Sequence, residues 1–177
     1  LSSSSAASDV YKRQVEAHTV NLDRLFESFE NSLSKFGNDH GMANSRARLR
    51  MTTLYQVASA NKGIVVGTGN KVEDFGVGFY TKYGDGGVDI SPIADCNKTG
   101  VWEMGRELNI LKEIIDAAPT DGLWDDGRTD EGQLGLKYSE LEEAMNNPNS
   151  PNREKYEKIR KLNLHKMEPI PVCKIPN

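Results

Sequence analysis

The stretch Ile64-Val-Val-Gly-Thr-Gly-Asn-Lys71 (IVVGTGNK) decides the fold. Three consecutive β-branched apolar residues are typical of a short strand that is buried on both faces of a parallel sheet. Gly67 and Gly69 follow at once, and ligands of open α/β sheets bind beyond the carboxyl ends of the strands. The spacing matches neither a Walker A loop nor a Rossmann fingerprint. An ordinary turn and a ligand-binding loop are therefore equally compatible with this stretch.

Helical periodicity is found on both sides of the predicted strand. Apolar residues at three- and four-residue spacing predict helices over about 22–33, 44–58, 97–108, 110–115, 139–146 and 156–162. Ser139 and Glu142 have the spacing of a capping box, which would open the fifth of these helices. Helices that flank a buried strand predict an α/β layer fold.

The helix predicted from Asn44 carries three arginines in its first two turns, namely Arg46, Arg48 and Arg50. Cations are disfavoured there by the helix dipole. Because broken local rules are often found at functional sites, this stretch is a candidate for a functional site.

The stretch Phe79–Ile93 (FYTKYGDGGVDISPI) is rich in glycine and acidic residues. Asp85 and Asp89 have the spacing of the first and third calcium ligands of an EF-hand loop, but the remaining positions do not match. A glycine turn with solvated acids is the simplest interpretation. The acidic run 116–131 is interpreted as a solvated loop, with a metal site as the less favoured alternative. Trp102 and the methionine of the helix from Asn97 are expected in the core.

Bulk composition excludes several classes of protein. The 177 residues carry a net charge of −4, which gives no electrostatic basis for nucleic-acid binding, and no apolar run approaches the length of a membrane span. Cys96 and Cys173 are far apart, so we expect a cytoplasmic protein without a disulfide framework. Residues 1–14 lack the features of a signal peptide and are expected to be a non-native, adaptor-like leader. Residues 15–177 then form one domain.

Several segments taken together resemble the ammonia-dependent NAD synthetases over about residues 15–172. These segments are Arg48-Leu-Arg50-Met51, Gly67-Thr-Gly-Asn-Lys-x-Glu73, Gly78-Phe-Tyr-Thr-Lys-Tyr-Gly-Asp-Gly-Gly-Val-Asp89, Pro92-Ile93, Asn97-Lys98-Thr99, Ala118-Pro-Thr120, Thr129-Asp-Glu131, Leu134-Gly135 and His165-Lys166.

This resemblance implies a homodimeric ligase of the α/β, Rossmann-like ATP-pyrophosphatase (adenine-nucleotide alpha-hydrolase) fold with a parallel sheet. It also implies a reaction in which ATP adenylates the nicotinate carboxylate of deamido-NAD and releases pyrophosphate. Ammonia then displaces AMP and leaves NAD.

The resemblance further implies three sets of site residues. ATP would contact Thr68, Lys98 and Thr120, and Glu73 would hold Mg²⁺. Deamido-NAD would contact Arg48, Lys82, Asp89, His165 and Lys166. Because two polyphosphates must meet near one carbonyl group, cations and a metal suit this task, and a lysine at a helix N-terminus suits phosphate.

One part of the family pattern, the loop Ser-Gly-Gly-Xaa-Asp-Ser, does not occur in this sequence. The Asp of that loop shares the metal with the carboxylate that matches Glu73. We therefore expect an N-terminally truncated synthetase that lacks its first strand and is inactive by itself. Residues 15–177 would then be the C-terminal part of the NAD synthetase domain rather than a whole domain. The alternatives are a noncatalytic dinucleotide-binding or dimerising fragment, and another ATP-pyrophosphatase ligase.

Overall fold

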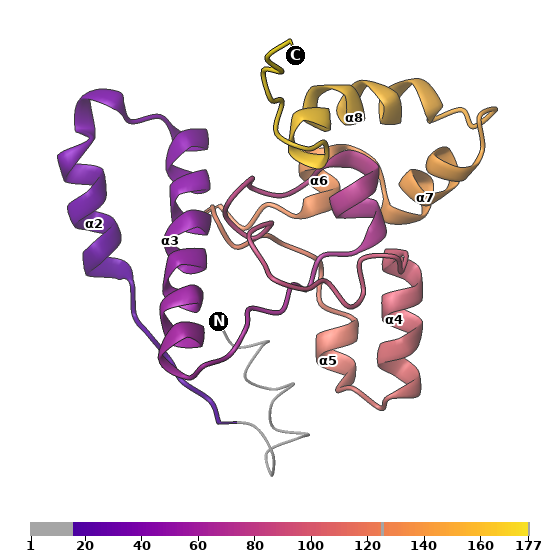
Figure 1. Ribbon diagram of the computed structural model, residues 1–177. Helices are drawn as coiled ribbons and strands as arrows, with labels where there is room; N and C mark the ends of the chain where they lie inside the picture. Colours follow the sequence, from indigo (N-terminus) through magenta and orange to yellow (C-terminus); the bar gives the residue numbers. More distant parts are fainter. Residues whose placement is uncertain (1–15, 125, 177) are drawn as a thin grey trace.

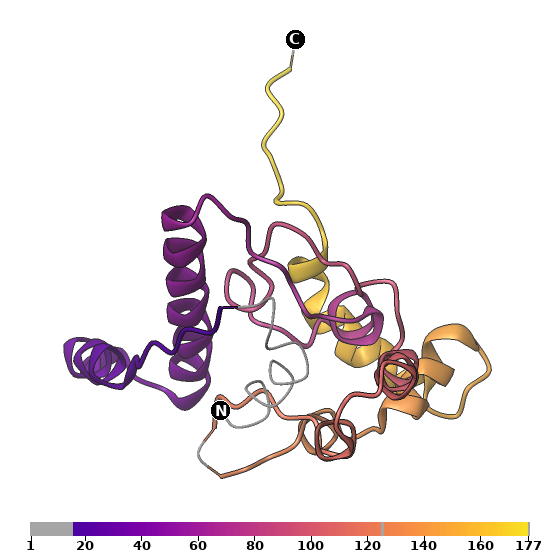
Figure 2. The same cartoon turned by 90° about the horizontal axis from the view of Figure 1, so that it is seen from below.

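A computed structural model of the chain describes residues 16–124 and 126–176, so the leader predicted over 1–14 lies outside the described residues. Its elements are α2 (Asp23–Ser32), η1 (Ser34–Phe36), α3 (Asp39–Ala60), η2 (Val72–Val77), α4 (Lys98–Glu107), α5 (Lys112–Ile115), α6 (Asp130–Leu134), α7 (Tyr138–Asn146) and α8 (Arg153–Met167). Figure 1 shows α2 and α3 side by side at one side of the molecule, with the remaining helices at the other. The C-terminal tail extends away from the body, as the rotated view makes clear (Figure 2).

Helix α3 begins five residues earlier than predicted, at Asp39. The side chain of Asn38 caps it by accepting a hydrogen bond from the backbone N–H of Gly41 at 2.8 Å. Arg46 consequently lies beyond the first two turns, and the first turn instead holds Asp39, which the helix dipole favours. The prediction that these arginines oppose the dipole was therefore wrong, because the start of the helix was misplaced.

The main core lies where η2, α6, α7 and α8 meet. Its buried members are Val72, Val77, Leu134, Leu136, Tyr138, Leu141, Ala144 and Tyr156, with Phe79, Trp102, Met145 and Ile159 packed around them. Asn70 starts η2, since its side-chain oxygen accepts the backbone N–H groups of Val72 and Glu73, both at 3.1 Å. Gly78 ends η2 with φ of 66°, a left-handed conformation that favours glycine. The sequence patterns did not predict η2 or α6.

The predicted strand 64–66 is only partly realised. Within the described residues, the sole β-pairing is a parallel bridge between Val66 and Ile90, with the N–H of Gly67 donating to the carbonyl of Ile90 at 2.7 Å. Val65 is buried, whereas Ile64 and Val66 are more than half exposed. The pairing is parallel, as expected, but burial on both faces was wrong because only one face of this segment is covered.

The predicted capping box at Ser139 was wrong. Helix α7 is capped two residues earlier, where Glu140 accepts the backbone N–H of Lys137 at 2.7 Å. Glu142 instead reaches another helix: its carboxylate accepts the N–H of Thr99 at 2.9 Å and the hydroxyl of Thr99 at 2.6 Å. Glu142 thus caps the first turn of α4.

The remaining predicted helices are confirmed, with changes in what they bury. Trp102 on α4 contacts the core as expected, but Met104 is 39% exposed, so its assignment to the core was wrong. On α8, Tyr156 is buried whereas Leu162 is exposed. In the described part of the chain, no helix combines the length and the apolar character needed to cross a bilayer.

Candidate functional site

The structure brings together two of the residues predicted to handle phosphate and metal. Lys98, the first residue of α4, places its Nζ 2.9 Å from Oε1 of Glu73 in η2. Both side chains are largely buried, which strengthens a pair compared with one in water. The Lys98 ammonium also lies 4.9 Å from the centre of the Tyr138 ring. A cation and a carboxylate are therefore held at one point, on two different elements.

Two further residues complete this cluster, and neither was singled out from the sequence. The hydroxyl of Tyr138 lies 2.5 Å from Oε1 of Glu73 and 3.1 Å from Oδ2 of Asp130. Asp130 is 6% exposed and begins α6, so its assignment to a solvated loop was wrong. The run Thr129-Asp-Glu131 belonged to the family resemblance but was given no role. Only the fold shows that Asp130 and Glu73 lie at the same hydroxyl group, that of Tyr138.

Burial controls the proton affinity of this cluster. It raises the pKa of Asp130, with the nearby charge of Glu73 as a further cause. It also raises the pKa of Tyr138, helped by the charge of Glu73, so this phenol stays protonated as a hydrogen-bond donor. The other carboxylate oxygen of Asp130, Oδ1, is buried without a hydrogen-bond partner among the described residues.

Asp74 lies next to Glu73 in the chain and also titrates abnormally. Burial, followed by the charges of Glu73 and Asp85, raises the pKa of its carboxyl from 3.8 to about 6. A Cβ at Gly69 would come within 2.1 Å of this carboxylate, so a larger residue there would require the Asp74 side chain to move. The loop after 64–66 is therefore packed against an acid rather than being open.

The two predicted threonines are placed differently from Glu73 and Lys98. Thr120 donates from Oγ1 to the carbonyl of Arg128 at 3.1 Å, and the carbonyl of Pro119 accepts the N–H of Asp130 at 3.0 Å. These bonds bring Thr120 close to the start of α6. Thr68 is exposed in the loop before η2. Contact of either threonine with ATP stays a prediction.

Four of the five residues predicted to contact deamido-NAD are linked to one another or to the same loop. Lys82 Nζ donates to the carbonyl of His165 at 2.5 Å, and the Arg48 guanidinium donates to the carbonyl of Lys82 at 3.3 Å. Lys166 donates to the carbonyls of Gly78 and Tyr80 at 2.8 and 2.7 Å. Helices α3 and α8 thus meet on the glycine-rich loop between them.

The neighbouring residues His165 and Lys166 differ in burial. His165 is exposed, whereas Lys166 is half-buried and burial lowers its pKa. A buried lysine that binds two carbonyls is held in one place, so it can present a fixed charge to a ligand.

Asp89, the fifth predicted residue, is hydrogen-bonded to a different part of the fold. One carboxylate oxygen accepts the N–H of Val65 at 2.7 Å, and the other accepts the hydroxyl of Tyr55 at 3.2 Å. It therefore ties α3 to the paired segments around Val66 and Ile90, and its contact with a dinucleotide stays a prediction.

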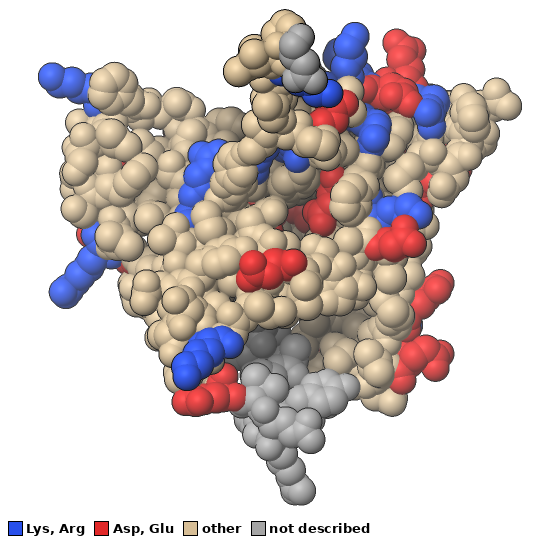
Figure 3. Space-filling view, in the orientation of Figure 1, with Lys and Arg blue, Asp and Glu red and all other residues tan. Residues whose placement is uncertain are grey.

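A cavity of about 220 Å³ lies beside Lys166, between α3, α6, α8 and the loops. It is lined by His40, Ala43, Asn44, Gly78, Phe79, Tyr80, Thr81, Asp85, Asp121, Leu123, Trp124, Gln133, Asn163 and Lys166. Aromatic walls with a few polar groups are typical of sites for small molecules. Figure 3 shows the surface hollowed between the two parts of the molecule, with acidic side chains visible inside.

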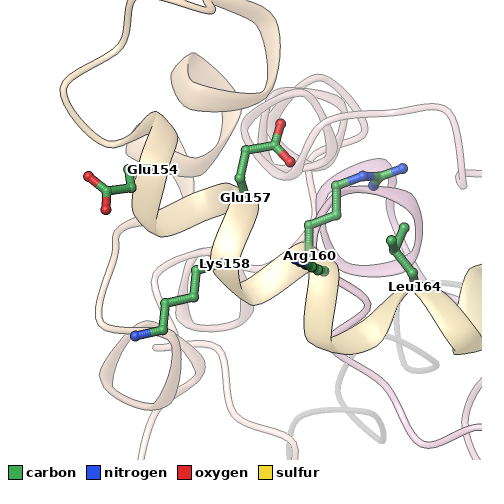
Figure 4. A pocket seen from close by; sticks show the side chains of 6 residues that line it. Glu154, Glu157, Lys158, Arg160 and Leu164 are labelled. Carbon is green, nitrogen blue, oxygen red and sulfur yellow. The ribbon is translucent and has the colours of Figure 1, made fainter.

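A second hollow, of about 510 Å³, runs along the outer face of α8. Its charged residues, among them Glu154, Lys158 and Arg160, project from the helix in different directions and do not converge on one point (Figure 4). This surface therefore lacks the geometry of a binding site.

The residues present suit Mg²⁺ only if a ligand completes the coordination. In residues 16–124 and 126–176, no group of three or more His, Cys, Asp or Glu side chains could hold a metal. Mg²⁺ is commonly bound by one or two carboxylates together with substrate phosphates and waters. Glu73 supplies a hard oxygen donor of that kind beside a lysine suited to phosphate.

Comparisons with known proteins identify the family of the chain. A family model described as NAD synthase matches residues 2–175. The NH(3)-dependent NAD(+) synthetase of Carboxydothermus hydrogenoformans is 44% identical over 131 residues, which is 71% of this chain and 53% of that protein. The synthetase of the same name from Alkaliphilus oremlandii is 38% identical over 164 residues, which is 90% of this chain and 65% of that protein. The chain thus spans about half to two thirds of the length of these curated relatives.

Solved structures give the same result. The NMN synthetase of Francisella tularensis superposes with a TM-score of 0.83 at 32% identity, covering 95% of this chain and 69% of that one. The NH3-dependent NAD synthetase of Campylobacter jejuni superposes with a TM-score of 0.66 at 19% identity, covering 88% and 64%, which supports the fold alone. Because the family model matches nearly the whole chain and a relative 38% identical covers 90% of it, the chain belongs to the NAD synthase family.

Proposed function

We propose that this chain carries part of the active site of an ammonia-dependent NAD synthetase, a ligase that converts deamido-NAD to NAD. The observation that carries the proposal is the buried Lys98–Glu73 pair at 2.9 Å, together with membership of the family. A pair of this kind suits a bound triphosphate, because the lysine attracts the phosphate oxygens and the carboxylate attracts their counter-cation.

The proposed reaction has two steps. A carboxylate oxygen of the nicotinate group attacks the α-phosphorus of ATP, and pyrophosphate leaves with the bonding electron pair. Ammonia then attacks the carbonyl carbon of the adenylate, AMP leaves, and the nitrogen loses a proton to give the amide. Lys98 and the threonines Thr68 and Thr120 would hold ATP, whereas Lys82, Lys166 and the residues near them would hold deamido-NAD.

Three further features belong to the proposal. Mg²⁺, held by Glu73 and the phosphates, would neutralise charge as pyrophosphate leaves. The parallel bridge at Val66 would be part of a larger parallel sheet in a Rossmann-like, homodimeric ATP-pyrophosphatase. The two free cysteines, Cys96 and Cys173, favour the cytoplasm. Since the sequence contains no Ser-Gly-Gly-Xaa-Asp-Ser loop, we expect this chain by itself to form no NAD, and detectable NAD would contradict that expectation.

Ligand titrations test the proposal without requiring turnover. Deamido-NAD and a non-hydrolysable ATP analogue are titrated separately by calorimetry, the analogue with Mg²⁺. We expect Lys82→Ala to weaken mainly deamido-NAD binding and Lys98→Ala to weaken mainly the analogue, because the two lysines belong to separate clusters. Lys158→Ala, on the outer face of α8, is the matched control. Equal losses of both ligands in both variants would contradict the assignment.

The structural likeness to the NMN synthetase supports a second candidate, in which the deamido form of NMN is the substrate. Titration with the mononucleotide beside the dinucleotide distinguishes the two. Binding of a dinucleotide without ATP would favour the noncatalytic fragment, and binding of ATP with neither nucleotide would favour another ATP-pyrophosphatase ligase.

A further inference from the structure

We propose that Tyr138 is a positioning residue that fixes the carboxylate of Glu73, so that one oxygen is engaged by protein donors and the other is left for a cation. The inference rests on the proposed function, since it concerns how the chain would hold the metal of the ATP step. It assigns a role to a side chain that does not itself touch a substrate.

The hydrogen bonds show how the carboxylate is oriented. The Tyr138 hydroxyl and the Lys98 ammonium approach the same oxygen, Oε1 of Glu73, at 2.5 and 2.9 Å. Among the described residues, no hydrogen bond reaches the other oxygen, Oε2. Two donors on one oxygen restrict rotation of the carboxyl group, and the second oxygen keeps its lone pairs for a ligand.

The donor itself is held rigidly. Tyr138 is fully buried in the core, and its ring packs against that of Trp102 in a T-shaped arrangement, with 5.9 Å between the ring centroids and an interplanar angle of 85°. The Tyr138 hydroxyl therefore cannot follow Glu73 if the carboxylate rotates. Fixed donors of this kind orient a metal ligand before the metal arrives, which lowers the cost of binding.

Asp130 is the second carboxylate within reach of the Tyr138 hydroxyl. Its Oδ2 lies 3.1 Å from the Tyr138 oxygen, and its backbone N–H is bonded to the carbonyl of Pro119. A phenol has one proton, so it donates to one carboxylate at a time, and the shorter contact is the one to Glu73. Three elements (η2, α6 and α7) thus converge on one hydroxyl group.

The substitution Tyr138→Phe removes only this hydroxyl and keeps the ring contacts with Trp102 and Lys98. We expect Mn²⁺, used as the probe for Mg²⁺ and followed by water-proton relaxation, to bind the full chain saturated with the non-hydrolysable ATP analogue about 10-fold more weakly, as is usual when an outer partner of a metal ligand is lost. The affinity for deamido-NAD, measured by calorimetry, should be unchanged, because its candidate residues lie in the other cluster. Tyr156→Phe, a buried tyrosine of the same core, is the matched control and should leave both affinities unchanged.

Each outcome decides a specific point. Weaker Mn²⁺ binding in Tyr138→Phe alone supports the positioning role. Equal Mn²⁺ affinity in all three proteins, or an equal loss of both ligands in both variants, overturns it. No Mn²⁺ binding by the unchanged chain overturns the metal assignment and the positioning role together. Mn²⁺ binding without deamido-NAD binding overturns the proposed substrate only.

Discussion

Replacement of Asp74 by Asn should stabilise the protein at neutral pH, because the folded state disfavours the ionised form of this carboxyl group. Burial and the charges of Glu73 and Asp85 raise the pKa of Asp74 from 3.8 to about 6. A difference of about two pKa units corresponds to about 3 kcal/mol of stability. The carboxylate is partly exposed and solvent screens part of this cost, so we expect the free energy of unfolding to increase by about 1–2 kcal/mol.

The sign of the effect depends on pH. Below about pH 3.8 the carboxyl is protonated in both the folded and the unfolded chain, so the charge costs nothing. Between about pH 4 and pH 6 the folded chain binds more protons than the unfolded one, and stability falls as the pH rises. Above about pH 6 the full cost is present. Asn stays neutral throughout, so its advantage should appear over this window.

Urea denaturation followed by circular dichroism at pH 4.5 and pH 7.5 measures the difference. The Asn variant should be more stable than the unchanged chain at pH 7.5, and most of this gain should be lost at pH 4.5. Asp126→Asn is the control of opposite sign, because hydrogen bonds from Arg128 lower the pKa of Asp126 to about 2. The electrostatic argument would be refuted if Asp74→Asn did not raise the free energy of unfolding at pH 7.5. It would also be refuted if the increase were the same at both pH values.

Two further substitutions test the packing around the candidate site. Glu142→Ala should lower the free energy of unfolding by about 1–3 kcal/mol in urea titrations, since it leaves two donors of Thr99 without their acceptor. Thr99→Ser keeps both donors, so its free energy of unfolding should fall much less. Gly78→Ala should cost about 2–4 kcal/mol in the same assay, because Gly78 has φ of 66° and a Cβ would lie 2.6 Å from Asn163 Cβ. Gly100→Ala, on α4 with open space around the new methyl group, is its control, and a similar loss in both glycine variants would contradict the steric argument.

The sequence was sufficient for elements that depend on local periodicity. The apolar spacing around Leu22–Leu33 predicted α2, and Asn97 marked the start of α4, because both signals lie within a few residues. The family resemblance also brought out Glu73 and Lys98, which the structure joins.

The features that escaped prediction depend on contacts between distant residues. Asp130 and Glu131 were interpreted as solvated acids. No local pattern reveals that the hydroxyl of Tyr138 contacts both Asp130 and Glu73. Glu142 had the spacing of a local cap, but its carboxylate serves α4, 43 residues away from it in the chain. The π-helical turn η2 has no periodicity that an α-helical or strand pattern would detect.

The bond from Thr99 to Glu142 has a consequence for local unfolding. Amide groups in the first turn of a helix usually exchange with solvent by fraying, independently of the rest of the fold. The first turn of α4 differs, because the Thr99 amide is covered by a carboxylate that belongs to α7. Opening α7 would therefore expose the start of α4 as well, and would release Lys98, its first residue, from its fixed position beside Glu73. We therefore expect the two helices to open together, and the order of the cation that faces Glu73 to depend on both of them.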